Sequence, residues 1–178
     1  NHQQSLGDTL EQIAFEKAGI IKPCRPVIIG KMPSQAREVI AKKAGQVNAL
    51  LLDATDHEFR NLKFSTMHTA WLQEFDFDKY HISLSMPGAM QRENFRIVFT
   101  VLEHLAVEFD FPLTEALGGL EEAFWPARCQ ILPDGIILDG AHNAAGIDVL
   151  IESVREFLPN QQIPILFGGC KDKNPQTC

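Results

Sequence analysis

The stretch from Leu138 to Ile151 constrains the fold of this chain more than any other segment. An apolar run ends at Asp139, the chain turns at Gly140, and an amphipathic segment begins after Asn143. This order predicts a buried strand, a tight turn and a helix with an asparagine N-cap, the repeating unit of an α/β sheet. In open α/β sheets, ligands bind beyond the carboxyl ends of the strands and close to helix N-termini. We therefore expect Asp139 and His142 to flank a ligand site suited to a nucleotide.

Upstream, three segments predict a β-α-β unit. The runs Val27–Gly30 and Ala49–Leu52 are short and apolar, as buried strands are, and apolar residues recur at helical spacing from Ser34 to Gly45 between them. Strands joined in this way are expected to be parallel, with a right-handed crossover. A helix from Asp8 to Ala18 precedes the unit, with Asp8 and Glu11 predicted to form its capping box.

The middle and the end of the chain predict further strands and helices. Residues 53–80 give the weakest pattern, which indicates an irregular pair of strands, whereas His81–Met86 alternates like a strand with one solvated face. After Pro87-Gly88, a long helix is expected to reach about Ala106, with an inner face of Val98, Val101, Leu102 and Leu105. The remaining expected elements are a helix from Thr114 to Phe124, a hairpin of Cys129–Leu132 and Ile136–Asp139, a helix through Leu158 and a strand at Ile163–Phe167.

Composition restricts the classes of function. The chain has 178 residues, 45% of them apolar, and a net charge of −7, so a substantial core is expected and a basic nucleic-acid surface is not. No apolar run approaches the roughly 20 residues that span a bilayer, and the first residues do not form a secretory signal, so no membrane role is expected. The four cysteines form no CxxC pair, which indicates reduced thiols in a cytoplasmic protein rather than a zinc site.

Two distant stretches resemble the folylpolyglutamate synthases, a branch of the Mur ligase superfamily. Leu6–Pro23 is similar to the family's LGxTxExIAxEKAGIxKP segment almost position by position. Asp139–Ala144 resembles its DGAHNP motif, with Ala144 in place of the proline. The two matches occur in the family's order and at roughly its spacing. Trp125–Arg128 also resembles the family's WPGR segment, with Ala127 in place of the glycine.

The resemblance implies a two-domain arrangement within an α/β fold. Residues 1–125 would form the C-terminal part of a P-loop-type central ATPase domain, a mostly parallel sheet with helices, and residues 126–178 the start of a Rossmann-like C-terminal glutamate-ligase domain. The family's phosphate-binding loop precedes the region matched here, and no GxxxxGK[ST] sequence occurs in the 178 residues. The expectation is an internal fragment of a larger ligase, inactive on its own.

The resemblance also implies a reaction. The family adds L-glutamate to the γ-carboxylate of a folate, with ATP and Mg²⁺ used to form an acyl phosphate first. We therefore expect an ATP-dependent amide ligase, monomeric as the larger protein, with folate and L-glutamate as substrates and dihydrofolate synthesis left open as a second activity. Two alternatives stay open: a Mur-type ligase for another amino acid, and a non-catalytic nucleotide-binding or interaction module, which the missing phosphate loop favours for the chain as given.

Two residues near the N-terminus match positions that hold Mg²⁺ in the family. His2 precedes Lys17 by 15 residues, which is the family's separation between a metal-ligating histidine and a carbamylated lysine. The residue before His2 is Asn1, where the family has aspartate. Carbamylation needs a deprotonated amine, which burial promotes, and Lys17 borders the expected apolar face of Leu10, Ile13, Ala14 and Ala18. The alternatives are a surface histidine at a chain end and a lysine that interacts with a helix C-terminus.

Three further residues are candidates for nucleotide binding. Gln91 and Asn94 lie in a segment similar to the family's GxHQxxN, with Met90 in place of the histidine, and the family's asparagine contacts ATP. Arg128 matches an arginine that contacts ATP, and guanidinium groups suit phosphates. A structural amide at Asn94 and a surface ion pair at Arg128 are the alternatives.

Asp139 and His142 complete the candidate set. The resemblance implies that Asp139 binds the nucleotide and that His142 is catalytic, facing the incoming glutamate or the phosphates. The alternatives are a turn-stabilising aspartate and a solvated loop imidazole.

Overall fold

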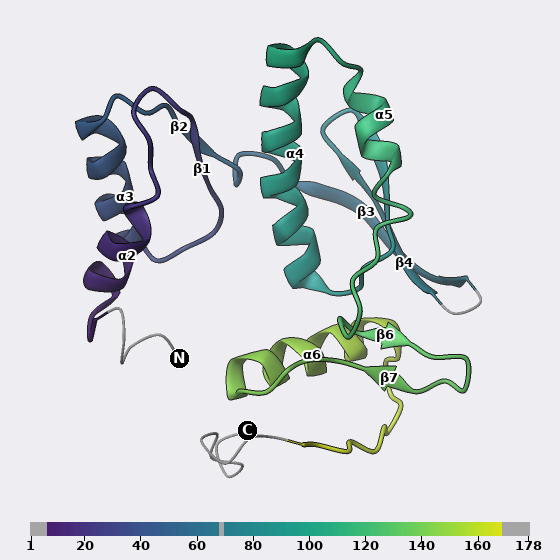
Figure 1. Ribbon diagram of the computed structural model, residues 1–178. Helices are drawn as coiled ribbons and strands as arrows, with labels where there is room; N and C mark the ends of the chain where they lie inside the picture. The colour runs from purple at the N-terminus through teal and green to yellow at the C-terminus, as the bar shows by residue number, and fades with distance from the viewer. Residues whose placement is uncertain (1–6, 68–69, 169–178) are drawn as a thin grey trace. The chain divides into compact units, whose positions relative to one another are not determined.

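The computed structural model describes residues 7–67 and 70–168, and these residues pack into two compact units. The first consists of Asn1–His57 and Glu93–Asp110, and the second of Glu58–Arg92 and Phe111–Cys178. Both combine helices with strands, which confirms the predicted α/β class (Figure 1). The two units do not test the predicted domain division between residues 125 and 126, which stays a prediction.

The first unit contains the predicted β-α-β arrangement. Strands β1 (Val27–Ile29) and β2 (Leu51–Asp53) are parallel, with Val27 opposite Leu51, and helix α3 (Ser34–Gln46) connects them. Helix α2 (Leu10–Ala18) packs on α3, and the two helices lie on the same side of the strand pair (Figure 1). The prediction of two parallel strands is confirmed, although β2 begins two residues later than expected.

The N-cap of helix α2 lies one residue later than predicted. Thr9 is the N-cap: its hydroxyl accepts the N–H of Gln12 at 3.2 Å, and the Gln12 side chain accepts the N–H of Thr9 at 3.2 Å. The prediction of Asp8 and Glu11 was therefore wrong, because Thr9 and Gln12 have the same three-residue spacing and Thr9 takes the extended backbone that a cap needs. Of the predicted inner face, Ala14 and Ala18 are buried, whereas Leu10 is exposed.

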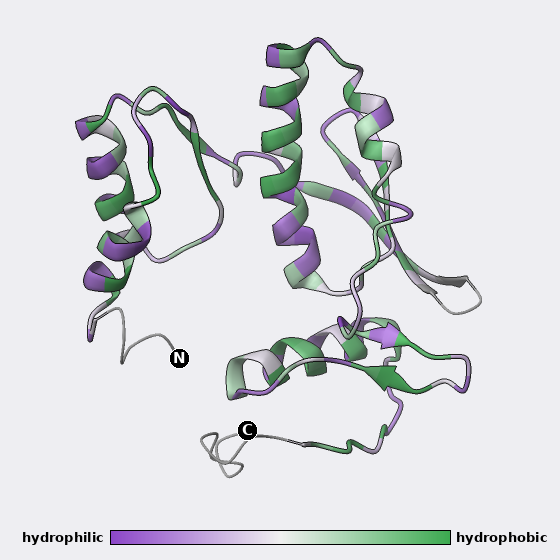
Figure 2. Cartoon of the chain, in the orientation of Figure 1, coloured by the Kyte–Doolittle hydropathy of each residue, from purple (hydrophilic) through white to green (hydrophobic). Residues whose placement is uncertain are grey.

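Helix α4 (Ala89–Phe109) contributes its first turn to the second unit and the rest to the first. Phe95 and Phe99 of this helix are buried, whereas Val98, predicted to face inward, is 39% exposed. The helix is therefore turned by one position from the prediction, which lets two phenyl rings rather than valines fill the core. Figure 2 shows polar residues in the first turns of α4 and apolar residues further along it.

The second unit is built on an antiparallel sheet in the order β3-β4-β5. Its strands are β3 (Phe59–Met67), β4 (Ala70–Phe77) and β5 (Tyr80–Leu84). The expected irregular pair of strands is thus a long hairpin, irregular only where the register shifts between Arg60 and Lys63. Along β5, Ile82 and Leu84 are buried and His81 is exposed, which confirms the predicted alternation.

A hairpin and a helix complete the second unit. Strands β6 (Gln130–Ile131) and β7 (Ile137–Leu138) are antiparallel, and helix α6 (Ala144–Phe157) follows with Asn143 as its N-cap, as predicted. The turn between the strands includes Gly135 at a φ of +77°, a conformation that favours glycine. Both the hairpin and the capped helix are therefore confirmed.

Three predictions for this region were wrong. The strand that ends at Asp139 is not buried, since Ile136 and Leu138 are exposed. Helix α5 (Leu113–Gly118) ends well before Phe124, near two consecutive glycines. Residues 163–167 form no strand, because no neighbouring segment within 7–67 and 70–168 pairs with them. No helix in these ranges is long and apolar enough to cross a membrane.

Candidate functional site

The second unit contains a pocket with a volume of about 300 Å³ between the β5–α4 junction and helix α6. Residues from the start of α4 form one wall, the N-terminal half of α6 forms the other, and the loop before β6 and the end of β7 close one side. The lining residues are Pro87, Met90, Gln91, Arg128, Cys129, Asp139, Ala141, Ala145, Gly146, Val149, Leu150 and Ser153.

Asp139 connects the two loops beside this pocket. One carboxylate oxygen accepts the backbone N–H of Cys129 at 2.7 Å, and the other accepts the N–H of Ala141 at 2.7 Å. The bond to Ala141 forms the turn that leads from β7 to α6. Asp139 therefore holds the loop before β6 against the loop before α6, and each oxygen keeps a second lone pair for a ligand.

The first turn of α6 presents a helix N-terminus to the pocket. Asn143 accepts the N–H of Gly146 at 2.9 Å, and Ala145 and Gly146 line the pocket wall. Unpaired N–H groups and the helix dipole make such an end attractive to anions. His142 lies just outside the lining, with an exposed side chain whose Nδ1 is 2.9 Å from the carbonyl oxygen of Gly140.

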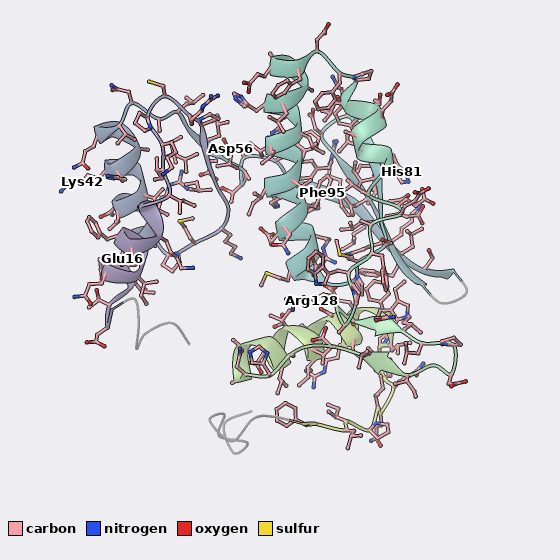
Figure 3. The ribbon with its side chains drawn as sticks, viewed as in Figure 1. Glu16, Lys42, Asp56, His81, Phe95 and Arg128 are labelled. Carbon is pink, nitrogen blue, oxygen red and sulfur yellow. The ribbon has the colours of Figure 1, made fainter. Side chains whose placement is uncertain are left out.

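Arg128 supplies the cation of this site. Figure 3 labels it in the loop that precedes β6. Its side chain is exposed, and within the described part of the chain it has no hydrogen bond or ion pair. A guanidinium without a protein partner at the edge of a pocket is available to bind an anion.

The residues beside Arg128 determine the conformation of its loop. Ala127 has a φ of +55°, a left-handed conformation that glycine adopts more easily. The Gln130 side chain accepts the N–H of Ala127 at 3.1 Å. This hydrogen bond holds the loop, while the Arg128 guanidinium has no partner within the described residues.

Cys129 is a buried thiol in the wall of the pocket. Burial and, to a smaller extent, the negative charge of Asp139 together raise the pKa of Cys129 to about 12. While it is buried, the thiol therefore stays protonated at neutral pH and reacts slowly as a nucleophile.

The structure brings together some of the predicted site residues and not others. Gln91, Arg128 and Asp139 line one pocket, and His142 lies beside it. Asn94 is exposed and, like Lys17, belongs to the first unit. His2 lies outside the described residues.

Lys17 lies in the last turn of α2, and its side chain is exposed. The expectation of a partly buried amine was therefore wrong, because the lysine projects to the side of the Ala14–Ala18 stripe rather than onto it. No group of three or more His, Cys, Asp or Glu side chains that could hold a metal ion occurs in residues 7–67 and 70–168.

Sequence reasoning missed the apolar wall of the pocket. Gly146, Val149, Leu150 and Ser153 recur at intervals of three and four residues, so they lie on one face of α6. That spacing is readable in the sequence, but helical spacing alone does not distinguish a pocket wall from a face packed in the core. Met90 also lines the pocket at the position where the resembling family has histidine.

Comparison with known proteins gives relatives of one kind. A folylpolyglutamate synthase of Lacticaseibacillus casei is 32% identical over 183 residues, covering 98% of this chain and 42% of the relative. A dihydrofolate synthase/folylpolyglutamate synthase of Bacillus subtilis is 31% identical over 196 residues, covering 99% of this chain and 43% of the relative. No family model matches the chain.

Solved structures agree with these relatives. A folylpolyglutamate synthase in complex with AMPPCP and folate superposes with a TM-score of 0.78 at 29% identity, covering 92% of this chain and 41% of that chain. The apo form of the L. casei enzyme gives a TM-score of 0.76 with the same identity and coverage. This chain is therefore a homologue of the folylpolyglutamate and dihydrofolate synthases, and it spans about two fifths of the length of the relatives that it matches.

Proposed function

We propose that this chain is part of an ATP-dependent ligase that adds L-glutamate to the γ-carboxylate of a folate through an acyl phosphate, and that the pocket beside α6 binds ATP. The observation that carries the proposal is the unpaired Arg128 at a pocket whose opposite wall is the N-terminus of α6. Two positive features that face one space suit a polyphosphate. The similarity to an enzyme solved with AMPPCP and folate supports the same ligand.

The residues of the pocket divide into three roles. Arg128 and the first turn of α6 bind phosphate oxygens, which carry increasing negative charge as the phosphoryl group transfers to the carboxylate. Val149 and Leu150 form an apolar surface for a base or ribose, while Asp139 keeps the two loops in place and offers lone pairs to hydroxyl groups. His142 stands beside the pocket, where an imidazole can hold the incoming amine.

Three roles outside the pocket rest on the sequence motifs. We propose that Asn94 contacts ATP, that Lys17 carries a carbamate, and that His2 binds Mg²⁺.

The test is an assay of ADP formation by the full-length natural protein. With ATP, Mg²⁺ and L-glutamate present, ADP formation should require a reduced folate, and the folate should gain one glutamate for each ADP. Equal turnover with a cell-wall precursor in place of folate would assign the protein to another branch of the Mur ligases. Binding of AMPPCP with no turnover on either substrate would favour the non-catalytic module.

A further inference from the structure

A partly buried ion pair joins the first turn of α4 to the C-terminal half of α6. The Arg92 guanidinium donates to both carboxylate oxygens of Glu156, at 2.7 and 3.0 Å. The Arg92 side chain is 10% exposed and that of Glu156 is 27% exposed. Two parallel hydrogen bonds between planar groups define an orientation as well as a distance. The pair therefore constrains how α6 lies against the start of α4.

The same guanidinium also contacts the core of the sheet. Arg92 donates to the side-chain oxygen of Gln73 at 2.7 Å, and Gln73 is fully buried. The amide nitrogen of Gln73 donates to the carbonyl oxygens of Met86 at 2.5 Å and Gly88 at 3.3 Å. A continuous network thus connects α6, through Arg92 and Gln73, to the backbone that leads into the pocket wall at Pro87.

Two further contacts also hold α6 in place. Gly88 has a φ of +100°, and a Cβ at this position would lie 2.8 Å from the Cβ of Ser153, so the loop touches α6 with no space to spare. One turn further along α6, Phe157 stacks on Trp71 with ring centroids 4.5 Å apart. The C-terminal half of α6 is therefore fixed, while its N-terminal half faces the pocket.

Stability alone is a weak explanation for this network. Removing two charges from water costs free energy that their attraction does little more than repay, and well-packed apolar residues often replace such pairs without loss. A bidentate pair that is also bonded to a buried amide specifies one arrangement instead. The residues that it holds, at 87–91 on one side and 146–153 on the other, are the two walls of the pocket.

We propose that Arg92 is a positioning residue that sets the separation of these two walls, through Glu156 and Gln73, and so the affinity of the pocket for its ligand. The first part of this proposal, the separation of the walls, concerns the pocket itself. The second part, the affinity for the ligand, rests on the proposed function. Arg92 does not line the pocket, so its effect passes through the backbone of residues 86–91 and through α6.

Cys129 provides a readout of wall separation that needs no enzyme activity. Its thiol lines the pocket, yet the residue is only 6% exposed. In the full-length protein, a small alkylating reagent followed by peptide mass spectrometry measures the labelling of this thiol alone. We expect Arg92→Met to accelerate labelling of Cys129 by at least about tenfold, since it leaves the partly buried Glu156 carboxylate and the buried Gln73 oxygen without their partner.

The double variant Arg92→Met/Glu156→Met separates position from stability. It removes both charges together, so it should lose less stability than Arg92→Met, although the buried Gln73 oxygen still loses its donor, while labelling remains fast. Arg92→Lys keeps the charge but cannot reproduce the bidentate geometry, so it should give an intermediate rate. Arg155→Met, an exposed arginine on the same helix, is the matched control and should leave the rate unchanged.

Labelling at several low denaturant concentrations distinguishes local opening of the pocket from global unfolding of the protein. Local opening of the pocket gives a rate that is independent of denaturant, whereas labelling through global unfolding rises steeply with it. A fast, denaturant-independent rate in the double variant supports the positioning role. An unchanged rate, or one that follows global unfolding, overturns it.

Nucleotide binding tests the second part. AMPPCP should bind the double variant about tenfold more weakly than the natural protein. With the natural protein binding AMPPCP, equal affinity in the double variant overturns this part. Failure of the natural protein to bind AMPPCP instead contradicts the proposed function, and the labelling rates then still decide whether Arg92 positions the walls.

Discussion

Asp139 accepts the backbone N–H of Cys129 at 2.7 Å, across a separation of ten residues in the sequence. Its other carboxylate oxygen accepts the N–H of Ala141. A side chain that looked from the sequence like a nucleotide ligand is thus also the link between two loops of the pocket. Both roles are compatible, because a carboxylate can accept about four hydrogen bonds.

Replacing Asp139 with alanine should therefore destabilise the protein as well as weaken nucleotide binding. Two partly buried N–H groups would lose their acceptor, which costs about 1–3 kcal/mol for each group that stays unsatisfied. Asp139→Asn should lose less, because one oxygen remains. Denaturant unfolding of the full-length protein measures the change, with the exposed turn residue Asp134→Ala as the control. Equal stability of Asp139→Ala and Asp134→Ala would contradict the structural role.

Arg128→Ala should raise the KM for ATP by about tenfold or more, with a smaller change in kcat. A hydrogen bond to a charged group contributes about 1.5–3 kcal/mol, and Arg128 has no partner in the described ranges to lose instead. Steady-state kinetics at saturating folate and glutamate measure both constants. Arg155→Ala removes a comparable exposed charge from the same unit and should change neither. An unchanged KM for ATP in Arg128→Ala would remove this arginine from the nucleotide site.

The parts of the fold that the sequence predicted well are those with local signals. The parallel strands around Val27 and Leu51 are short apolar runs on either side of a periodic segment, and Asn143 is a strong N-cap residue. The turn at Gly135 needs the left-handed backbone that glycine adopts. In each case the determining interactions lie within a few residues of one another.

The parts that the sequence did not predict depend on distant partners. The inner face of α4 carries Phe99 rather than Val98, and adjacent residues on a helix differ by about 100° in direction, so one step changes the buried face. The Arg92–Glu156 pair joins residues 64 positions apart and has no local signature. The apolar run at 163–167 resembles a strand, but a strand needs a neighbour, and none pairs with it in the described part of the chain.

Stability should depend on pH through His81. Its ring nitrogen lies 3.0 Å from Asp76, and this hydrogen bond, with a further contribution from Glu74, raises the pKa of His81. Hydrogen bonds from Asn61 and His81 lower the pKa of Asp76. The histidine's contribution is thus fully present below its unfolded pKa of 6.5 and is lost as pH rises through the raised folded value. The aspartate's contribution is lost as pH falls through a folded value below 3.8.

The comparison of the natural protein with His81→Gln measures this contribution. The difference in free energy of unfolding should be larger at about pH 5.5 than at about pH 8.5. Because His81 is exposed, about 1 M salt should reduce the difference. A difference that is equal at the two pH values, or that grows with pH, would show that the pair does not stabilise the sheet.

Lys17→Ala should lower ligase activity by about 100-fold, which is the loss typical when one preorganised electrostatic group is removed. A short-chain carboxylic acid should restore part of the activity by supplying the missing anion. Carbon NMR of the natural protein with isotope-labelled bicarbonate should show a carbamate that is absent from the variant. Lys22→Ala, an exposed lysine nearby, is the control. Normal turnover by Lys17→Ala would leave the lysine with a helix C-terminal role only.

The isolated 178-residue chain should neither hydrolyse ATP nor ligate folate, and it should bind nucleotide weakly. Phosphoryl transfer depends on several groups positioned together, and the chain contains no GxxxxGK[ST] loop to hold the phosphates. Within the described residues, large apolar side chains such as Phe124, Trp125 and Leu166 are exposed, which favours self-association. Calorimetric titration with MgATP, with the full-length protein as the control, measures the affinity. A dissociation constant in the low micromolar range for the isolated chain, about −8 kcal/mol, would show that these residues form a complete nucleotide site.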